Sequence, residues 1–290
     1  TKGSRRNISA HYDVGNEFFA LFLDENLMYS SAIFPDSSMT LKDAQSARLG
    51  HICRKLELQP ADHLLEIGTG WGGLAIYAAT NHGCRVTTTT ISKEQYDLAS
   101  RRVAEAGLKD RITVLCADYR DLTGRYDKLV SLEMIEAVGF HYFDDYFGAC
   151  SRLLTSEGMK LLQAITIADQ RYEMAKQSVD FIQRYIFPGS CIPSITAMCQ
   201  SIAGATDMRL FHLEDIGPHY VQTLQVWRKN LHRNRKRILG LGYSKEFVRM
   251  WEFYFCYCEG GFAERVISDV QMLLTKPDNR RAPLLCLAGA

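Results

Sequence analysis

The segment from Glu66 to Gly73 reads E-I-G-T-G-W-G-G and lies between a short apolar stretch and a helical one. Glycine tolerates a positive φ angle and lets the backbone approach a ligand closely. The N-terminus of the helix that follows attracts a negatively charged group. The turn therefore predicts a cofactor site, with Gly68 and Gly70 against the ligand and Glu66 directly before them.

A dinucleotide is one ligand that such a turn could bind. The glycines at 68, 70 and 73 fit the G-x-G-x-x-G spacing, which is usually followed about 20 residues later by an acid that holds a ribose. Here Glu94 lies 26 residues beyond Gly68 and already in the next predicted helix. NAD is therefore disfavoured, although it stays an alternative.

Other residues favour the adenosine part of S-adenosylmethionine. Asp118 ends a predicted strand and would accept a hydrogen bond from the adenine amino group, with Tyr119 beside the ring. Thr90 and Gln95 lie where the ribose or the adenine should sit. Two plainer interpretations stay open: Asp118 as the N-cap of a helical turn, and Thr90 as an ordinary β-branched strand residue.

These residues follow a regular alternation of strands and helices. Predicted strands cover 63–67, 84–91, 111–118, 126–134, 158–167 and 268–276, and predicted helices cover 73–83, 93–107 and 143–154. The alternation requires a mostly parallel sheet with helices on both faces. We therefore expect an α/β protein with a Rossmann-like class I methyltransferase fold and a seven-stranded sheet.

One methyltransferase domain is expected over residues 1–290. Aromatic and amphipathic spacing between 11 and 58 predicts an N-terminal helical cap over 1–58, followed by the cofactor-binding core over 59–168. The strand–helix rhythm stops over 169–218, where a helix, a proline-glycine turn and a helix predict a helical lid insertion. Residues 219–290 are expected to complete the core.

Composition bears on partners and compartment. The formal net charge is +1 with 23% charged residues, so a nucleic-acid partner is not expected. The nine cysteines form no CxxC pair and no Cys/His cluster, which predicts reduced thiols, a cytoplasmic protein and no metal site. No apolar run reaches the roughly 18 residues of a membrane helix, and the first ten residues do not resemble a signal peptide.

Several blocks, in the correct order, resemble the cyclopropane fatty acid synthase family over nearly all of residues 8–275. They are HYDVGNEFFALFLD (11–24), MYSSAIF (28–34), LLEIGTGWGG (64–73), TTISKEQ (89–95), ADYRDL (117–122), MIEAVG (134–139), RYIFPGSCIPS (184–194) and IGPHYVQTL (216–224). The larger bacterial members carry a further N-terminal domain, so the resemblance implies that this chain is the catalytic domain alone.

The resemblance implies a reaction and its cofactors. In that family a cis double bond of an acyl chain attacks the methyl group of S-adenosylmethionine and becomes a carbocation. A bicarbonate ion held in the site removes a proton, and a cyclopropane ring closes. The carrier is a membrane phospholipid in one branch and an acyl carrier protein in another, so an unsaturated acyl lipid, most simply a phospholipid, is the expected substrate.

Residue roles follow from the same resemblance. Tyr29 and Ser30 should contact the methionine part of the cofactor. Gly68 and Gly70 should contact the cofactor where it lies against the glycine turn. The bicarbonate ligands that the resemblance implies are Ser31, Glu136, Gln163, Ile165 and Tyr220. Two of these depart from the bacterial pattern, which usually has cysteine where Ser31 stands and histidine where Gln163 stands.

The two departures differ in consequence. Ser31 keeps its backbone N–H, whereas Gln163 can donate through its amide but cannot become cationic or relay a proton. Anion binding should weaken unless another donor substitutes, although plant-type members that resemble cyclopropane synthases share a glutamine in this LLQ block. A carboxylate base is the alternative, with Glu136 taking the proton directly or through water. Structural alternatives are Glu136 as a helix cap or ion-pair partner, and Tyr220 as a packed aromatic.

A long acyl chain needs an apolar tunnel, and aromatic faces stabilise an alkyl cation. The expected channel residues, for which core packing is the alternative, are Tyr12, Phe19, Phe181, Tyr185 and Phe187. The segment WRKNLHRNRKR (227–237) places six Lys or Arg residues on a predicted helix that could rest on an anionic membrane or form an ordinary solvated face. A position at the inner face of the membrane and a homodimer both stay open.

Three other functions compete with cyclopropanation. One is C-methylation of the acyl chain without ring closure, which gives a methyl-branched product. Another is N-methylation of a small amine, which a small, acid-lined pocket would favour. The last is a degenerate cofactor-binding protein without activity, against which the intact glycine turn, Asp118 and Glu136 argue.

Overall fold

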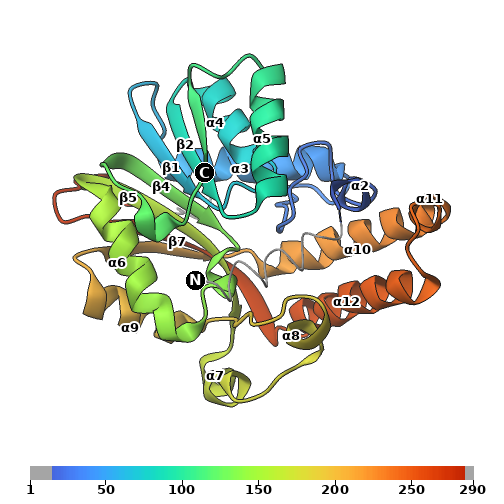
Figure 1. Ribbon diagram of the computed structural model, residues 1–290. Coiled ribbons are helices and arrows are strands. Elements are labelled where there is room, and N and C mark those ends of the chain that lie inside the picture. The colour runs from blue at the N-terminus through green and yellow to red at the C-terminus, as the bar shows by residue number, and fades with distance from the viewer. Residues whose placement is uncertain (1–14, 285–290) are drawn as a thin grey trace.

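The computed structural model describes residues 15–284 and contains a seven-stranded sheet with helices on both faces (Figure 1). The strands are β1 (His63–Ile67), β2 (Arg85–Thr90), β3 (Ile112–Cys116), β4 (Tyr126–Leu132), β5 (Leu154–Ile167), β6 (Arg209–Asp215) and β7 (Ile267–Thr275). Their order is β3-β2-β1-β4-β5-β7-β6, and neighbours are parallel except at β7, which is antiparallel to β5 and β6. The expected fold class is confirmed, and the strand order reverses between β1 and β4, where sheets of this kind bind ligands.

One face of the sheet is covered by α3 (Leu41–Lys55), α4 (Gly73–His82) and α5 (Lys93–Glu105). Successive residues of a strand point to opposite faces. Leu64 of β1 therefore packs against Ile52 of α3 and Ala78 of α4, whereas Leu65 points to the other side. This alternation explains why the short apolar run of β1 is buried on both faces.

The opposite face is covered by α6 (Phe143–Leu153) and α9 (Ile195–Ala205). Phe147 of α6 and Met198 of α9 are fully buried here, together with Leu65 and Leu162 from the sheet. The short α7 (Asp169–Lys176) and α8 (Phe181–Tyr185) precede α9 and lie at the bottom of the view in Figure 1.

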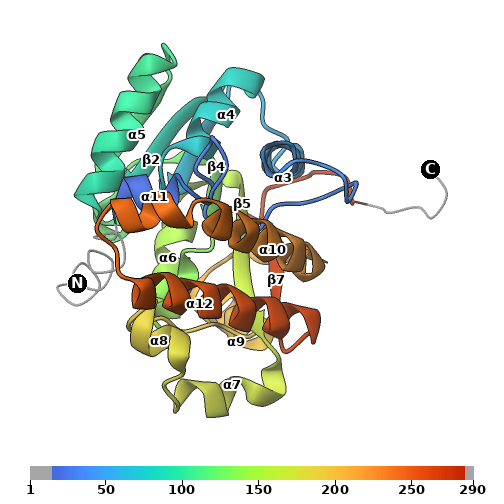
Figure 2. The same ribbon diagram turned by 90° about the vertical axis from the view of Figure 1, so that its right-hand side faces the viewer.

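A third apolar cluster joins α2 (Asn16–Phe19), α10 (Gly217–Arg233), α11 (Arg235–Gly240) and α12 (Lys245–Ala263). Helices α10 and α12 lie side by side, as Figures 1 and 2 show. Trp227 of α10 and Trp251 of α12 are buried in this cluster together with Trp71 of the glycine turn. The helical layer therefore packs directly beside the edge where β1 ends.

Two segments differ from the expectation. Within residues 15–58, α2 and α3 are the only α-helices, and residues 20–40 form turns and an extended loop. The aromatic side chains that predicted helical structure here, such as Phe18 and Phe22, are buried by tertiary packing against Trp251. Strand β6 lies within the segment expected to be a helical lid; it is a half-exposed edge strand, so its apolar signal is weak.

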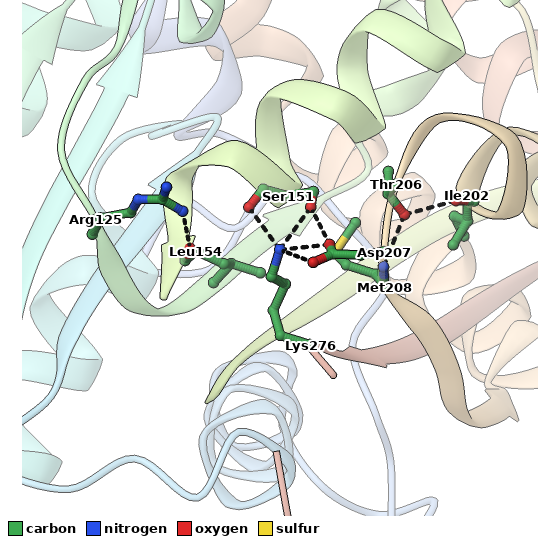
Figure 3. Close-up of polar contacts among 8 residues, drawn as sticks. All are labelled: Arg125, Ser151, Leu154, Ile202, Thr206, Asp207, Met208 and Lys276. Atoms are coloured by element: carbon green, nitrogen blue, oxygen red, sulfur yellow. Dashed lines mark hydrogen bonds and ion pairs between the residues drawn. The ribbon is translucent and has the colours of Figure 1, made fainter. Parts of the chain in front are cut away.

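Lys276 bonds to Ser151 and Asp207 at the edge of the sheet opposite the glycine turn (Figure 3). Its Nζ lies 2.5 and 2.7 Å from the two carboxylate oxygens of Asp207 and 3.0 Å from Ser151 Oγ. These residues come from α6, the α9–β6 connection and the segment after β7, so one cation ties three segments together. Within residues 15–284, no helix is long and apolar enough to cross a bilayer.

Candidate active site

The glycine turn between β1 and α4 has the backbone that the sequence predicted. Gly68, Gly70 and Gly72 have φ angles of +99°, +52° and +85°, in the region that glycine favours. A Cβ added at Gly70 would meet no atom within 4 Å, so the turn opens onto free space there. A Cβ at Gly73 would lie 2.4 Å from Met28 Sδ, which shows how closely the loop before Tyr29 approaches the start of α4.

Glu66 lies beneath this turn and is buried. The hydroxyl of Thr88 in β2 donates to Glu66 Oε2 at 2.6 Å. Burial raises the pKa of Glu66 to about 8, because the charged form is poorly solvated there. Glu66 thus connects β1 to β2 under the turn, and its contact with a cofactor stays a prediction.

Thr90 and Gln95 are brought together, as the sequence predicted for two residues of one subsite. The Thr90 hydroxyl donates to Gln95 Oε1 at 2.8 Å, and both side chains are buried. Thr90 ends β2, and Gln95 lies in the first turn of α5, where Ser92 caps the helix. The pair therefore lies at the carboxyl edge of the sheet, next to the strand that leads into the glycine turn.

Asp118 is the N-cap of the short 3₁₀ helix η1 (Tyr119–Asp121). Its carboxylate accepts from Arg120 Nε at 2.9 Å and from Arg120 Nη2 at 2.5 Å. The plainer interpretation of Asp118 is thus present in the structure, and a bond to adenine would have to coexist with Arg120. The ring of Tyr119 meets Tyr146 edge to face, with 5.5 Å between the centroids.

The loop that contains Tyr29, Ser30 and Ser31 lies in the N-terminal part of the sequence and contacts this edge of the sheet through Ser31. The Tyr29 ring packs against Trp227 with 5.3 Å between the centroids, and its hydroxyl donates to Tyr254 Oη at 3.2 Å. The carbonyl of Ser30 accepts from Gln45 of α3 at 2.9 Å. The loop is therefore held by both α3 and the helical layer.

Glu133, directly after β4, is the centre of the polar site. Its Oε1 accepts from the backbone N–H of Ser31 at 2.9 Å and from Gln163 Nε2 at 2.7 Å. Its Oε2 accepts from the Tyr220 hydroxyl at 2.7 Å. Three of the five residues expected to bind bicarbonate thus converge on one carboxylate of the chain itself.

The other two expected bicarbonate ligands contact each other. The backbone N–H of Ile165 donates to Glu136 Oε1 at 2.6 Å. Burial, and then the nearby charge of Glu133, raise the pKa of Glu136 to about 8. Glu136 Oε2 is buried and has no hydrogen-bond partner among the described residues, so one oxygen stays available to a ligand.

Arg48 of α3 is the fully buried cation of the site. Its Nη1 lies 3.4 Å from Gln163 Oε1, while its Nε and Nη2 have no hydrogen-bond partner among residues 15–284. Asp269 of β7 accepts from Gln163 Nε2 at 2.9 Å. Burial and the charge of Glu133 raise the pKa of Asp269 well above its usual range.

The expected channel residues divide into two groups. Phe19 is fully buried, and Phe187 packs beside Tyr29 and Tyr254, so both line the helical layer at the site. Tyr185 is 54% exposed, and Phe181 packs against the exposed ring of Phe253 with 4.6 Å between the centroids. Tyr185 is thus not enclosed by the protein, and its place in the channel, like that of Phe181, stays a prediction. Tyr12 lies outside the described residues.

Sequence reasoning missed Glu133, Arg48 and Asp269. Glu133 had been included in a predicted strand over 126–134, although an acid at the carboxyl end of a buried parallel strand is itself a signal for a site. Arg48 and Asp269 carry no local signal, because their partner Gln163 lies 115 and 106 positions away in the sequence.

S-adenosylmethionine, the cofactor that this fold class implies, fits the residues at this edge. The turn leaves open space at Gly70, where a substituent would meet no atom. The Thr90–Gln95 pair offers hydroxyl and amide groups for a ribose, and the loop of Tyr29 and Ser30 reaches Glu133 through the backbone N–H of Ser31. The sheet order and this site define the class: the chain has the fold of class I S-adenosylmethionine-dependent methyltransferases.

Comparison with known proteins assigns the family within that class. The family described as mycolic acid cyclopropane synthetase matches residues 1–272, and the chain belongs to it. The solved structure of mycolic acid cyclopropane synthase CmaA1 complexed with SAH and CTAB superimposes with a TM-score of 0.87 at 31% identity, covering 94% of this chain and 98% of that one.

Two curated relatives carry different names. Tuberculostearic acid methyltransferase UfaA1 of Mycobacterium tuberculosis is 39% identical over 94% of this chain, and 65% of its own length is covered. Cyclopropane-fatty-acyl-phospholipid synthase of Escherichia coli is 38% identical over 92% of this chain, with 66% of its own length covered. The chain thus spans about two thirds of the length of these relatives.

Proposed function

We propose that the protein transfers the methyl carbon of S-adenosylmethionine to the cis double bond of an unsaturated acyl chain, on phospholipid, and closes a cyclopropane ring. The observation that carries this proposal is the pair of half-buried carboxylates, Glu133 and Glu136, beside the aromatic cluster of the helical layer at the edge where β1 and β4 end. Ring closure requires loss of a proton, which a carboxylate can accept, and aromatic faces stabilise the cation that precedes it.

The proposed cofactor contacts are those of the glycine turn and its neighbours. Gly68 and Gly70 would face the bound cofactor, Thr90 and Gln95 its ribose, Asp118 and Tyr119 its adenine, and Tyr29 and Ser30 its methionine part, with Glu66 beneath the turn. When bound, the cofactor supplies an electrophilic methyl group. The chain's own residues orient the acyl chain and receive the proton.

A branched product without a ring, methylene-branched or methyl-branched with a remaining double bond, is the second candidate. It is favoured by the 39% identity to a protein named tuberculostearic acid methyltransferase. Loss of a proton can leave a carbon–carbon double bond in place of a ring, so the two outcomes use the same carboxylates. The choice depends on how the chain is held at the site.

Purified protein incubated with S-adenosylmethionine and vesicles of a cis-monounsaturated phospholipid tests the proposal. Mass spectrometry of the lipids should show the gain of one CH₂ unit, and proton NMR should show cyclopropane resonances. Vinyl resonances of a branched methylene would favour the second candidate. Unchanged lipids, with S-adenosylhomocysteine released from the cofactor only when an amine is added as methyl acceptor, would contradict both.

We further propose that the protein is cytoplasmic and contacts the inner face of a membrane peripherally. The segment 227–237 has its apolar residues Trp227 and Leu231 buried in the protein, so they are not available to insert into lipid. Exposed charges of Arg233, Lys236 and Arg237 would make the contact electrostatic. Sedimentation with anionic vesicles, lost at high salt and with neutral vesicles, tests it. A homodimer stays a prediction.

A further inference from the structure

We propose that Glu133 is the base that removes the proton, in the place that the family resemblance assigns to bicarbonate. The inference rests on the proposed function, because the proton comes from the transferred methyl group. It adds to that function a residue of the chain that replaces an external anion.

The donors expected to hold bicarbonate are engaged by Glu133. Ser31 N–H, Gln163 Nε2 and Tyr220 Oη lie 2.9, 2.7 and 2.7 Å from its carboxylate oxygens. A carboxylate and a bicarbonate ion present the same planar pair of acceptor oxygens, so one can satisfy the donors of the other. Burial keeps the pKa of Tyr220 well above its usual range, so the phenol remains a donor.

The remaining ligands are also engaged. Ile165 N–H, expected to bind the anion, donates to Glu136 Oε1 at 2.6 Å. A bicarbonate ion in this arrangement would therefore lack its backbone donors and would meet two carboxylates at close range. The residues present do not fit bicarbonate as a resident group.

The backbone at Glu133 gives an independent observation. Its φ angle is +48°, in the left-handed region that costs a non-glycine residue roughly 1–2 kcal/mol. Its N–H donates to the carbonyl of Gln163 at 2.8 Å, which holds this conformation. Such strain is kept where the surroundings fix it, and it clusters at active sites. Here it aims a carboxylate from the end of β4 at Tyr220 and Ser31.

The π electrons of the alkene form a bond to the methyl carbon, whose former bonding pair stays on sulfur, and the neighbouring acyl carbon becomes cationic. Glu133 takes a proton from the new methyl group. The C–H electron pair forms the third bond of the ring, and the neutral acid then releases its proton to water.

Two variants separate this role from a structural one. Glycine favours the positive φ at 133, so Glu133→Gly should fold while leaving a vacancy for an anion. Glu133→Gln fills the same space without a base. Binding of S-adenosylhomocysteine, measured by calorimetry, should stay near the wild-type affinity in both and so reports an intact fold.

Turnover is measured in carbonate-free buffer and with added bicarbonate, and binding of ¹³C-labelled bicarbonate is followed by NMR without turnover. Wild type should be indifferent to bicarbonate and should not bind it. Glu133→Gly should lose about 100-fold or more in turnover, bind bicarbonate and recover activity with it, whereas Glu133→Gln should lose activity and not recover.

Wild-type turnover that falls when bicarbonate is removed would overturn the inference, as would bicarbonate binding by the wild type. Full turnover of Glu133→Gly in carbonate-free buffer would do the same. The proposed function fails separately, if wild type methylates no lipid under either condition. The NMR comparison of wild type with Glu133→Gly still tests the occupancy of the site in that case.

Discussion

Tyr220 Oη donates a hydrogen bond of 2.7 Å to Glu133 Oε2, although the two residues lie 87 positions apart in the sequence. The bond joins helix α10 to the end of β4. The Tyr220 ring also stacks on Phe262 of α12, with 4.4 Å between the centroids. The carboxylate at the centre of the site is therefore positioned by the helical layer as well as by the sheet.

Removing this hydroxyl should slow catalysis without displacing the ring. We expect Tyr220→Phe to lower turnover about 10-fold or more, because a hydrogen bond to a charged group contributes about 1.5–3 kcal/mol. Affinity for S-adenosylhomocysteine should be unchanged. The matched control is Tyr257→Phe on the exposed side of α12, which should keep full activity. Equal turnover of the two variants would contradict the role of Tyr220.

The open space at Gly70 predicts where the cofactor lies. Gly70→Ala adds a methyl group that meets no protein atom but would occupy space proposed for the cofactor. We therefore expect the affinity for S-adenosylhomocysteine to fall about tenfold or more, which corresponds to about 1.4 kcal/mol. Gly107→Ala is the control, because Gly107 also has a positive φ and free space but follows α5 at the far edge of the sheet. Calorimetry should show wild-type affinity for Gly107→Ala. Similar losses of affinity in both variants would mean that backbone strain, and not contact with the cofactor, causes them.

Close packing at Gly73 predicts an effect on stability. A Cβ there would lie 2.4 Å from Met28 Sδ and 2.9 Å from the carbonyl oxygen of Asn26, so the loop must shift. We expect Gly73→Ala to lower the free energy of unfolding by about 1–3 kcal/mol, measured with denaturant. Gly260→Ala in α12 meets no atom and should be neutral or stabilising. An unchanged stability of Gly73→Ala would show that the contact is not tight.

The raised pKa of Glu66 predicts a pH effect on stability. Burial raises this pKa from the ordinary 4.5 to about 8, so the folded state keeps a proton that the unfolded chain releases. The contribution of Glu66 is therefore fully present below pH 4.5 and is lost as the pH rises towards 8. Between pH 4.5 and 8 the free energy of unfolding of wild type should fall relative to that of Glu66→Gln. Above this range the difference between the two proteins should stay constant.

Denaturant unfolding of the cofactor-free protein at several pH values measures this difference. Glu94→Gln on the exposed side of α5 serves as the control and should run parallel to wild type throughout. A constant difference between wild type and Glu66→Gln across the range would mean that Glu66 is solvated in the folded state.

The two groups of channel residues predict different effects on substrate use. Phe187 packs between Tyr29 and Tyr254, so Phe187→Ala should raise the KM for lipid vesicles or lower kcat/KM severalfold. Tyr185→Ala, on the exposed side of α8, should keep catalysis on a short, detergent-solubilised acyl substrate. If Tyr185→Ala, and not Phe187→Ala, lowered turnover of that substrate, the acyl chain would have to follow a different path.

Local patterns were enough to predict six of the seven strands and the glycine turn. The run from His63 to Gly73 contains a short apolar strand, glycines at the turn and the start of a helix, and each is dictated by residues within ten positions. The same holds for the β-branched strand that ends at Thr90. These elements were predicted correctly because their causes are short-range.

The acid–base site depends on contacts that no local pattern contains. Glu133 reads as a strand residue, and its left-handed backbone is set by the bond to Gln163 on the neighbouring strand. Arg48 reads as an ordinary helical residue, yet it is fully buried beside Gln163. The helical structure expected between residues 20 and 40 was a wrong prediction for the same reason, since tertiary packing buries the aromatic side chains there.

Deuterium labelling tests the central claim, that the methyl group transferred from the cofactor loses a proton as the ring closes. The protein is supplied with S-adenosylmethionine carrying a CD₃ methyl group and with vesicles of cis-monounsaturated phospholipid, and the acyl products are analysed by mass spectrometry. The account predicts that the new carbon arrives with two deuterium atoms, the third having been lost to Glu133 and then to water. A product that keeps all three, on an acyl chain or on an amine, would contradict it.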